Sequence, residues 1–412
     1  MGRGMKQETK HEWSFRARFR RRAFGWKSQP AIARVKEAVA EIKQAARKDR
    51  VLAAEGAVLF LEKVSPALEQ VDSSSGAIGA AVNKAVKELA SIIAQAPADE
   101  TRRDQWLERL WQAIEDDGIP YIELLPEHWG ELCDTPARAS RWADGFIDIV
   151  RRSWSPDPGR SSYYKGTSAC MSALLKAGRN EELLALLKIA PFTWWHYRQW
   201  GVKALVAMGK KAEALRYAEE SRGINDSPIA IAIACEEILL SSGLAEEAYD
   251  RYAIEANQGT TYVATYRAIA KKYPRKETRD ILRDLAASTP GEEGKWFAAA
   301  KSAGLWREAI ELANLTPCDP RTLTRAARDM GAAEPLFAVE AGLAALRWLA
   351  EGYGYEISGL DVREAYDHTM QAAEKAGCKT ETHARIHALA ASDASAGRIV
   401  AKALGREISL KQ

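Results

Sequence analysis

The segment Ala204–Ser221, with the sequence ALVAMGKKAEALRYAEES, contains the pattern on which the second half of the chain is built. An apolar run ends at Gly209, and a second run opens with Glu213 and Ala214 after a few intervening residues. Glycine readily adopts the left-handed backbone conformation that ends a helix. A glutamate in the first turn of the next helix is favoured by the helix dipole. The segment therefore predicts two helices joined by a turn at Gly209.

Variants of this hairpin follow one another at a spacing of 30 to 34 residues, with turns predicted at Gly178, Gly209, Gly243, Tyr273 and Gly304. A glutamate stands four residues after each turn, at Glu182, Glu213, Glu247, Glu277 and Glu308, and is followed by Leu183, Ala214, Ala248, Thr278 and Ala309. Four residues before each turn stand Leu174, Leu205, Leu239, Ile269 and Ala300, which are predicted to face the stack. A period near 34 residues is typical of stacked helical hairpins.

The pattern Gly-x-x-x-Glu-Ala before an apolar helix resembles the turn and second helix of tetratricopeptide (TPR-like) repeats. The resemblance covers residues 161–345 and departs from the family in the first helix, where the family's Trp and Gly positions are not reproduced. The chain as a whole is also similar to bacterial helical-repeat proteins. The resemblance implies an all-α, TPR-like, right-handed α-solenoid of antiparallel helix hairpins, preceded by an N-terminal helical domain.

Composition shifts predict five parts of the chain. A Ser-Trp-Ser-Pro-Asp-Pro-Gly sequence marks a linker ahead of the repeats, and a strongly apolar run at 337–350 is expected to cap them. The predicted parts are a basic aromatic arm (1–28), an N-terminal helical domain (29–152), the linker (153–160), the repeats (161–345), and C-terminal capping helices with a tail (346–412).

Several classes of protein are disfavoured by composition. The sequence has no apolar run of about 18 residues, which a membrane-spanning helix would need, and no apolar segment typical of a secretory signal follows the charged N-terminus. The five cysteines are scattered and form no C-x-x-C pair, which is typical of buried thiols in a reducing compartment. The sequence therefore predicts a cytoplasmic protein.

The N-terminal arm concentrates the positive charge. Residues 1–27 carry a net charge of +7, while the whole chain carries +3, so the remaining residues carry −4. Aromatic residues interleave the basic ones, and the candidate contact residues are Trp13, Arg16, Arg18, Phe19, Arg20, Arg21, Arg22 and Trp26. This pattern fits docking on the chain's own acidic surface or on a second copy, contact with nucleic acid, or an amphipathic helix on an anionic membrane.

The most aromatic stretch of the chain lies between the first two repeats. Its candidate partner-binding residues are Trp194, Trp195, His196, Tyr197, Arg198 and Trp200. Trp, Tyr and Arg are enriched among the residues that dominate binding energy at interfaces. The stretch is predicted either to line the concave groove of the solenoid or to fill its core.

Two groups of titratable residues are candidates for metal or acid–base sites. Glu115, Asp116, Asp117, Glu123, Glu127 and Glu131 surround His128, and His383 and His387 stand four residues apart. Their spacing matches no calcium loop and no H-E-x-x-H motif, so a solvated surface is expected, which in the acidic group could receive the basic arm. Signatures of hydrolases, kinases and dinucleotide-binding enzymes are absent from the sequence. No catalytic residue, metal or cofactor is predicted.

The sequence thus predicts a non-enzymatic adaptor or scaffold that binds a protein or peptide in the groove of a helical-repeat solenoid. The alternatives are a nucleic-acid-associated protein whose arm contacts phosphate, and an all-helical enzyme without a recognisable motif. The arm could also support a homo-oligomer.

Overall fold

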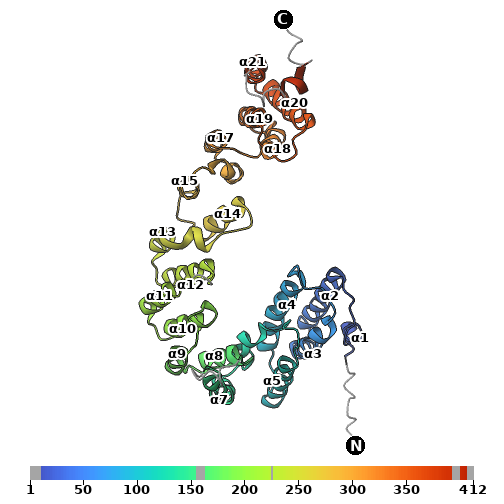
Figure 1. Cartoon of the computed structure of the whole chain (residues 1–412), viewed down its shortest axis with the longest axis vertical. Helices are drawn as coiled ribbons and strands as arrows, with labels where there is room; N and C mark the ends of the chain where they lie inside the picture. The colour runs from blue at the N-terminus through green and yellow to red at the C-terminus, as the bar shows by residue number, and fades with distance from the viewer. Residues whose placement is uncertain (1–10, 155–162, 224–225, 392–399, 406–412) are drawn as a thin grey trace, which may run out of the picture. The chain divides into compact units, whose positions relative to one another are not determined.

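The computed structural model describes residues 11–154, 163–223, 226–391 and 400–405. These residues are all-α: they form helices joined by turns and loops, and they include no strand. They belong to two compact units, Met1–Ser227 (unit 1) and Pro228–Gln412 (unit 2), whose helices are labelled in Figure 1. The predicted linker lies within unit 1, and its residues 155–160 fall outside the described residues.

Unit 1 contains the helices of the first half of the chain and the first two repeat hairpins. Its helices α3, α5 and α7 each begin at an Asp or Thr side chain that accepts hydrogen bonds from the backbone of the first turn. Large side chains fill its core, among them Phe60, Trp106 and Trp129. The helices are α1 (Ser14–Arg18), α2 (Ser28–Ala46), α3 (Arg50–Leu68), α4 (Ala77–Ala94), α5 (Glu100–Glu115), η1 (Leu125–His128), α6 (Trp129–Leu132), α7 (Pro136–Ser153), α8 (Thr167–Lys176), α9 (Asn180–Lys188), α10 (Trp195–Ala207) and α11 (Lys211–Glu219).

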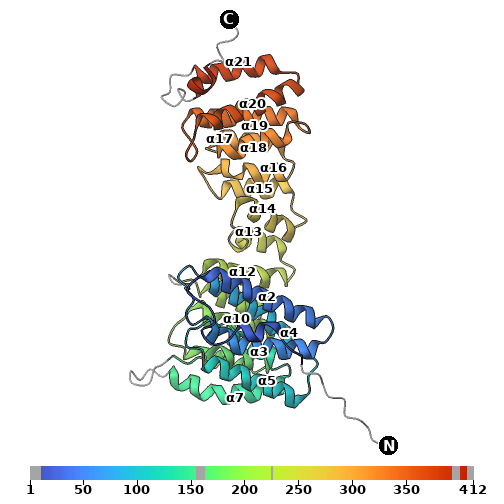
Figure 2. The same ribbon diagram turned by 90° about the vertical axis from the view of Figure 1, so that its right-hand side faces the viewer.

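Unit 2 consists of hairpins that follow one another in chain order (Figure 2). Its helices are α12 (Pro228–Leu240), α13 (Ala245–Ala256), α14 (Tyr262–Lys272), α15 (Thr278–Ala287), η2 (Glu293–Trp296), α16 (Phe297–Ser302), α17 (Trp306–Leu315), α18 (Pro320–Met330), α19 (Pro335–Ala350), α20 (Gly359–Lys375) and α21 (Lys379–Ala390). The apolar run expected to cap the repeats is α19. This helix packs against α17, α18, α20 and α21, because a helix that is apolar on nearly all sides needs cover, whereas a cap needs a polar outer face.

The predicted turn glycines adopt the conformation that the repeat requires. The φ angles of Gly178, Gly209, Gly243 and Gly304 lie between 73° and 76°. The backbone N–H of the residue after each glycine donates to the carbonyl of the apolar residue four positions before it, with distances of 2.9 to 3.1 Å. Those apolar residues, Leu174, Leu205, Leu239 and Ala300, are all buried. The same residue therefore packs in the core and accepts the hydrogen bond that closes the turn.

The turn without a glycine is held by side chains instead. Tyr273 ends α14 at a negative φ, and its hydroxyl donates to a carboxylate oxygen of Glu236 at 2.6 Å. Glu236 lies in α12 and is 0% exposed. It also accepts from Lys272 Nζ at 2.6 Å and from the Asn257 side-chain amide at 2.7 Å. Burial, together with the bond to Glu236, raises the pKa of Tyr273 above its ordinary value, so the hydroxyl remains a donor at neutral pH.

A pair of Gly→Ala substitutions in unit 1 should act in opposite directions. Gly209→Ala should lower the free energy of unfolding by about 1–2 kcal/mol, because alanine resists the left-handed conformation. Gly145→Ala should raise it by about 0.5–1 kcal/mol, because Gly145 lies inside α7 and no atom comes within 4 Å of an added Cβ. Urea unfolding measures both, and a shift of the same sign for the two variants would contradict this account of the turn.

Removal of the buried carboxylate should destabilise unit 2. Glu236→Ala leaves three donors without their acceptor, and we expect the free energy of unfolding to fall by about 2–3 kcal/mol. The matched control is Glu237→Ala, since Glu237 is its exposed neighbour in α12, and that change should stay within about 0.5 kcal/mol. Equal effects of the two variants in urea unfolding would show that the Glu236 network does not stabilise the unit.

Candidate functional site

The aromatic stretch of the sequence forms the start of α10, where three rings stack in a row. Phe192 lies parallel to Trp194 with ring centroids 4.2 Å apart, and Trp194 lies 6.2 Å from Tyr197 at an interplanar angle of 20°. Tyr197 in turn contacts Trp154 at 5.2 Å. Trp194 is 43% exposed, whereas Trp200, six residues further along, is 3% exposed and belongs to the core. The stretch therefore supplies both surface rings and core rings, as helical periodicity requires.

Polar contacts fix the first turn of α10. The carboxylate of Asp226 accepts from the backbone N–H of Trp195 at 2.6 Å, which satisfies one of the unpaired donors at the helix N-terminus. His196 Nε2 lies 3.2 Å from the hydroxyl of Ser168, and His196 Nδ1 lies 3.6 Å from a carboxylate oxygen of Glu127. These contacts connect α10 to α8 and η1.

The order Ser168–His196–Glu127 has the connectivity of a serine hydrolase triad. However, the 3.6 Å separation between His196 and Glu127 exceeds hydrogen-bond length, so the carboxylate does not orient the imidazole. Ser168 is also buried. The contact at hydrogen-bond distance, between Ser168 and His196, connects the start of α10 to α8.

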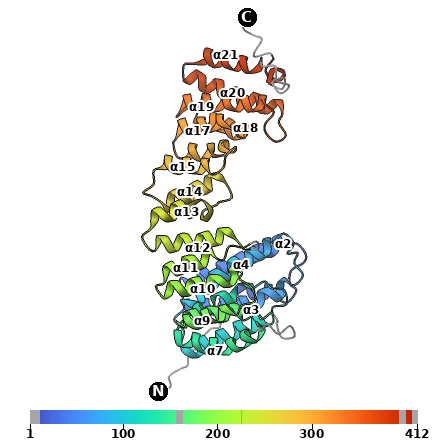
Figure 3. The same cartoon turned by 60° about the vertical axis from the view of Figure 1, so that its left-hand side comes forward.

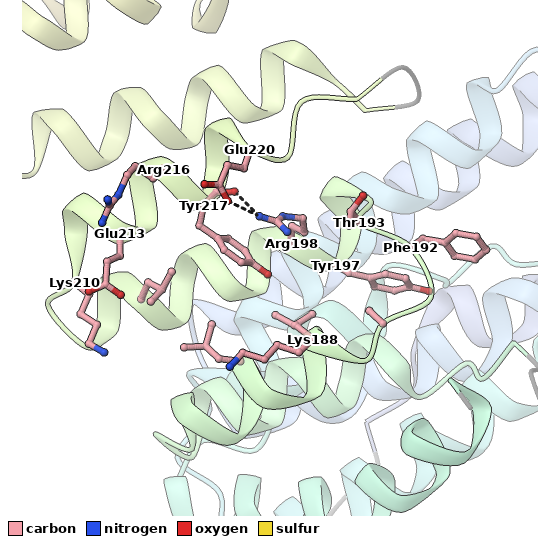
Figure 4. A pocket seen from close by; sticks show the side chains of 14 residues that line it. Lys188, Phe192, Thr193, Tyr197, Arg198, Lys210, Glu213, Arg216, Tyr217 and Glu220 are labelled. Carbon is pink, nitrogen blue, oxygen red and sulfur yellow. Dashed lines mark hydrogen bonds and ion pairs between the residues drawn. The ribbon is translucent and has the colours of Figure 1, made fainter. Parts of the chain in front are cut away.

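A pocket with a cavity volume of about 530 Å³ opens between α9, α10 and α11, beside the stacked rings. We call it the aromatic groove. Figure 4 shows Phe192 and Tyr197 at one end, Lys210, Glu213 and Arg216 at the other, and Arg198 and Tyr217 between them. The groove is lined by Leu184, Leu187, Lys188, Ala190, Phe192, Thr193, Tyr197, Arg198, Leu205, Lys210, Glu213, Arg216, Tyr217 and Glu220.

Arg198 is held firmly in the middle of this groove. Its guanidinium lies 3.7 Å from the centre of the Tyr217 ring and donates to Ser221 Oγ at 2.6 Å and to the Tyr217 carbonyl at 3.0 Å. A carboxylate oxygen of Glu220 lies 3.8 Å away. Gly201 makes room for this arrangement, because a Cβ there would come within 2.7 Å of the Tyr217 ring.

The remaining cations of the groove are available to a ligand. Lys188, Lys210 and Arg216 are exposed, and none has an ion-pair partner among the residues that the structure describes. Glu213 is the one carboxylate of the lining that is likewise unpaired within those residues. The groove therefore presents more unpaired positive than negative charge.

The two tyrosines of the groove remain protonated at neutral pH. Burial raises the pKa of Tyr197 and of Tyr217, although Arg198 opposes the shift at Tyr217. Both hydroxyls can therefore donate and accept hydrogen bonds. The groove thus combines aromatic surface, neutral hydroxyls and unpaired charges, which suits recognition of a polar chain with an apolar anchor.

The predicted groove residues separate in the structure. Tyr197 and Arg198 line the aromatic groove, and Trp194 stacks beside it. Trp195 and His196 hold the start of α10, and Trp200 is in the core. No pattern in the sequence indicated four further groove residues, because they lie outside α10: Lys188, Lys210, Arg216 and Tyr217. Gly201, a glycine inside a helix with no turn to make, was an available signal for a close approach.

The basic arm packs on the helices of unit 1. Phe15 and Phe19 contact Phe60 of α3 with ring centroids 5.7 and 5.0 Å apart, and all three rings are buried. Trp13 is buried where Gly56 of α3 leaves room, since a Cβ at Gly56 would lie 2.3 Å from its ring. Rings in these positions cannot stack on bases, whereas Trp26 is 72% exposed.

Within the described residues, the ion pairs of the arm are with acids of α2 and of the C-terminal end of α3, and not with the predicted acidic group around His128. Arg18 pairs with Glu37 at 2.9 Å, and Arg21 and Arg22 pair with Glu69 at 3.0 and 2.8 Å. The hydrogen bond from Arg22, with Arg21 close by, holds the pKa of Glu69 below its usual value. Arg16 and Arg20 are exposed, and Arg3, Lys6 and Lys10 of the arm lie outside the described residues.

Other candidate chemical groups are built into the fold. Asp117 of the acidic group is buried and accepts from Ser65 and from the backbone of Ile122. Burial raises the pKa of Cys133, Cys170 and Cys318 to about 12, so these thiols remain protonated at neutral pH. Within the described ranges, no three His, Cys, Asp or Glu side chains are grouped so that they could hold a metal ion. The helices of that same part of the chain include none long and apolar enough to cross a membrane.

Comparisons with known proteins add little to this geometry. No protein-family model matches the chain, and no curated protein matches it. The chain is similar to one in a solved structure described as "Crystal structure of APC/C hetero-tetramer Cut9-Hcn1", with 14% sequence identity over 86% of this chain and 76% of that chain. The TM-score of 0.23 is too low to support an argument, so the fold assignment rests on the helices and turns themselves.

Replacing a buried aromatic residue of the arm by alanine should distinguish the contribution of packing to stability from the contribution of charge. Phe19→Ala removes a side chain that is 1% exposed, and we expect the free energy of unfolding of unit 1 to fall by about 3 kcal/mol. Arg20→Ala, at the exposed position next to it, should change it by less than about 0.5 kcal/mol. If thermal unfolding shows no difference between the two variants, the arm does not pack on unit 1 in solution.

Proposed function

We propose that the chain is a non-enzymatic adaptor or scaffold that holds a peptide segment of a partner protein in the aromatic groove. The observation that supports this most directly is the meeting of stacked aromatic rings and unpaired cations in one cavity of about 530 Å³. Ligand pockets typically measure about 300–1,000 Å³ and combine apolar walls with a few placed polar groups. Tyr, Trp and Arg are also the residue types that dominate binding energy at interfaces.

The chemistry of the groove specifies the kind of peptide. Phe192 and Tyr197 at one end offer flat apolar surface for an aromatic or aliphatic side chain. Lys210 and Arg216 at the other end, with Lys188 on the wall, offer charge for carboxylates. We therefore expect a segment in which an apolar anchor is followed by acidic residues.

The proposal can be tested with a labelled peptide of about twelve residues that carries one Phe followed by several Glu. Its binding to the full chain is measured by fluorescence anisotropy. Lys188→Glu combined with Arg216→Glu should weaken binding about tenfold or more, because attraction becomes repulsion at two contacts. A peptide with Lys in place of Glu should then bind this double variant better than it binds the original chain.

The matched control is Lys48→Glu combined with Lys87→Glu, which changes the net charge equally at exposed positions outside the groove. Binding to this control should stay within about twofold of the original value. If the control weakens binding as much as the groove variant does, the peptide responds to net charge alone. That result, or an acidic peptide that does not bind at all, would contradict the proposed function.

A further inference from the structure

A second groove of unit 1 lies between α2 and α4, which run side by side (Figure 3). The two helices point the same way. At their N-terminal ends the backbone N–H of Asp72 donates to the Trp26 carbonyl at 2.9 Å, and toward their C-terminal ends Lys43 pairs with Glu88 at 3.0 Å. The groove has a cavity volume of about 260 Å³. We call it the lysine groove.

The floor of the lysine groove is apolar and is built from small or β-branched residues. Val35 and Val39 come from α2, Ala81 and Ala85 come from α4, and Ala40 stands at the edge. Because these side chains are short, another helix can pack here with its axis at the usual distance of 8–10 Å, about 9 Å on average. Among the described elements of unit 1, α1, α3, η1 and α6 pack extensively against α2 or α4, and none of these four contributes a residue to the groove lining.

The rim of the lysine groove is basic. Lys36 of α2 and Lys84 of α4 both line the groove, and they have no ion-pair partner among the described residues. Lys43 is paired with Glu88, the only acid of the lining. A terminal helical layer normally shows a polar outer face, whereas here an apolar floor is left between unpaired cations.

We infer that the lysine groove binds an acidic amphipathic helix of a partner protein. The apolar face of such a helix packs on Ala40, Ala81 and the aliphatic parts of the rim lysines, above the buried valines. Its flanking carboxylates reach Lys36 and Lys84, as in other helix-in-groove complexes. Charge complementarity makes the ligand acidic, and the straight floor between two parallel helices suits a third helix. The inference uses no residue of the aromatic groove and does not depend on the proposed function.

Two other classes of partner fit the lysine groove less well. A membrane surface is reached by apolar side chains that project from the protein, but Val35 and Ala85 are recessed and only 1% and 3% exposed. Single-stranded nucleic acid is held by stacking on aromatic rings, and the lining of the lysine groove contains no aromatic residue.

The test uses a designed, labelled peptide of about sixteen residues, with Leu on one helical face and Glu beside it. Fluorescence anisotropy measures its binding to the full chain, and circular dichroism measures helix formation on binding. Lys36→Glu combined with Lys84→Glu should weaken binding about tenfold or more. A peptide with Lys in place of Glu should regain binding to that variant.

Three controls decide between explanations. Lys87→Glu, on α4 but outside the lining, and the aromatic-groove variant with Lys188→Glu and Arg216→Glu should each leave binding within about twofold. A peptide of the same composition in scrambled order lacks a continuous apolar face. It should bind at least tenfold more weakly, which is about the effect expected from losing that apolar contact.

Equal binding of the scrambled peptide, or equal loss with Lys87→Glu, would overturn the inference, because either result indicates non-specific charge attraction. It would also be overturned if phosphatidylserine vesicles or single-stranded DNA bound in a way that required Lys36 and Lys84 while the helical peptide did not bind. Loss of peptide binding in the aromatic-groove variant alone would assign the helix to that groove.

Discussion

The fold depends on one backbone constraint, the left-handed glycine that ends the first helix of a hairpin. At Gly178, Gly209, Gly243 and Gly304 this conformation lets the next N–H return to the carbonyl of a buried residue four positions earlier. One residue of each hairpin thus has two roles: its side chain packs in the core, and its backbone carbonyl accepts the hydrogen bond that closes the turn. Each turn sets the position of the helix that follows it. The turns at Gly178 and Gly209 therefore position α10 and α11, which line the aromatic groove.

The exception shows what the constraint contributes. Where Tyr273 replaces glycine, the chain has no left-handed residue at the turn, and the buried carboxylate of Glu236 accepts from Tyr273, Lys272 and Asn257 instead. At this turn, side-chain hydrogen bonds that involve three helices take the place of the backbone hydrogen bond that follows a left-handed glycine. Such a network is costly to leave incomplete. The three donors explain why the charge of Glu236 is tolerated on the buried face of α12, whose other buried residues are apolar.

Sequence patterns could predict the hairpins but only part of the candidate site. Turn chemistry and period are local, so the spacing of the glycines and the burial of Leu174, Leu205, Leu239 and Ala300 could be read from the chain. Glu277 departs from the pattern because it is the N-cap of α15 and not a residue of its first turn. The groove is not local: Lys188, Arg198 and Tyr217 come from three helices, and their convergence depends on packing around Gly201. The arm illustrates the same limit: its alternation of aromatic and basic residues could be read from the sequence, whereas the partner ring Phe60 and the acids Glu37 and Glu69 could not.

The structural surfaces of unit 1 differ from its candidate binding surfaces in whether their cations are paired with acids. Arg18, Arg21 and Arg22 of the arm are neutralised by acids of the same unit, so these charges are already paired within the fold. Five other cations have no ion-pair partner among the described residues, although they line grooves with apolar surface: Lys188, Lys210 and Arg216 in the aromatic groove, and Lys36 and Lys84 in the lysine groove. Exposed charges near an apolar floor contribute little to folding, but they speed encounter and exclude basic partners. On this reasoning the rings and the apolar floors would supply most of the affinity of each groove, and the lysines and Arg216 would set which partners enter.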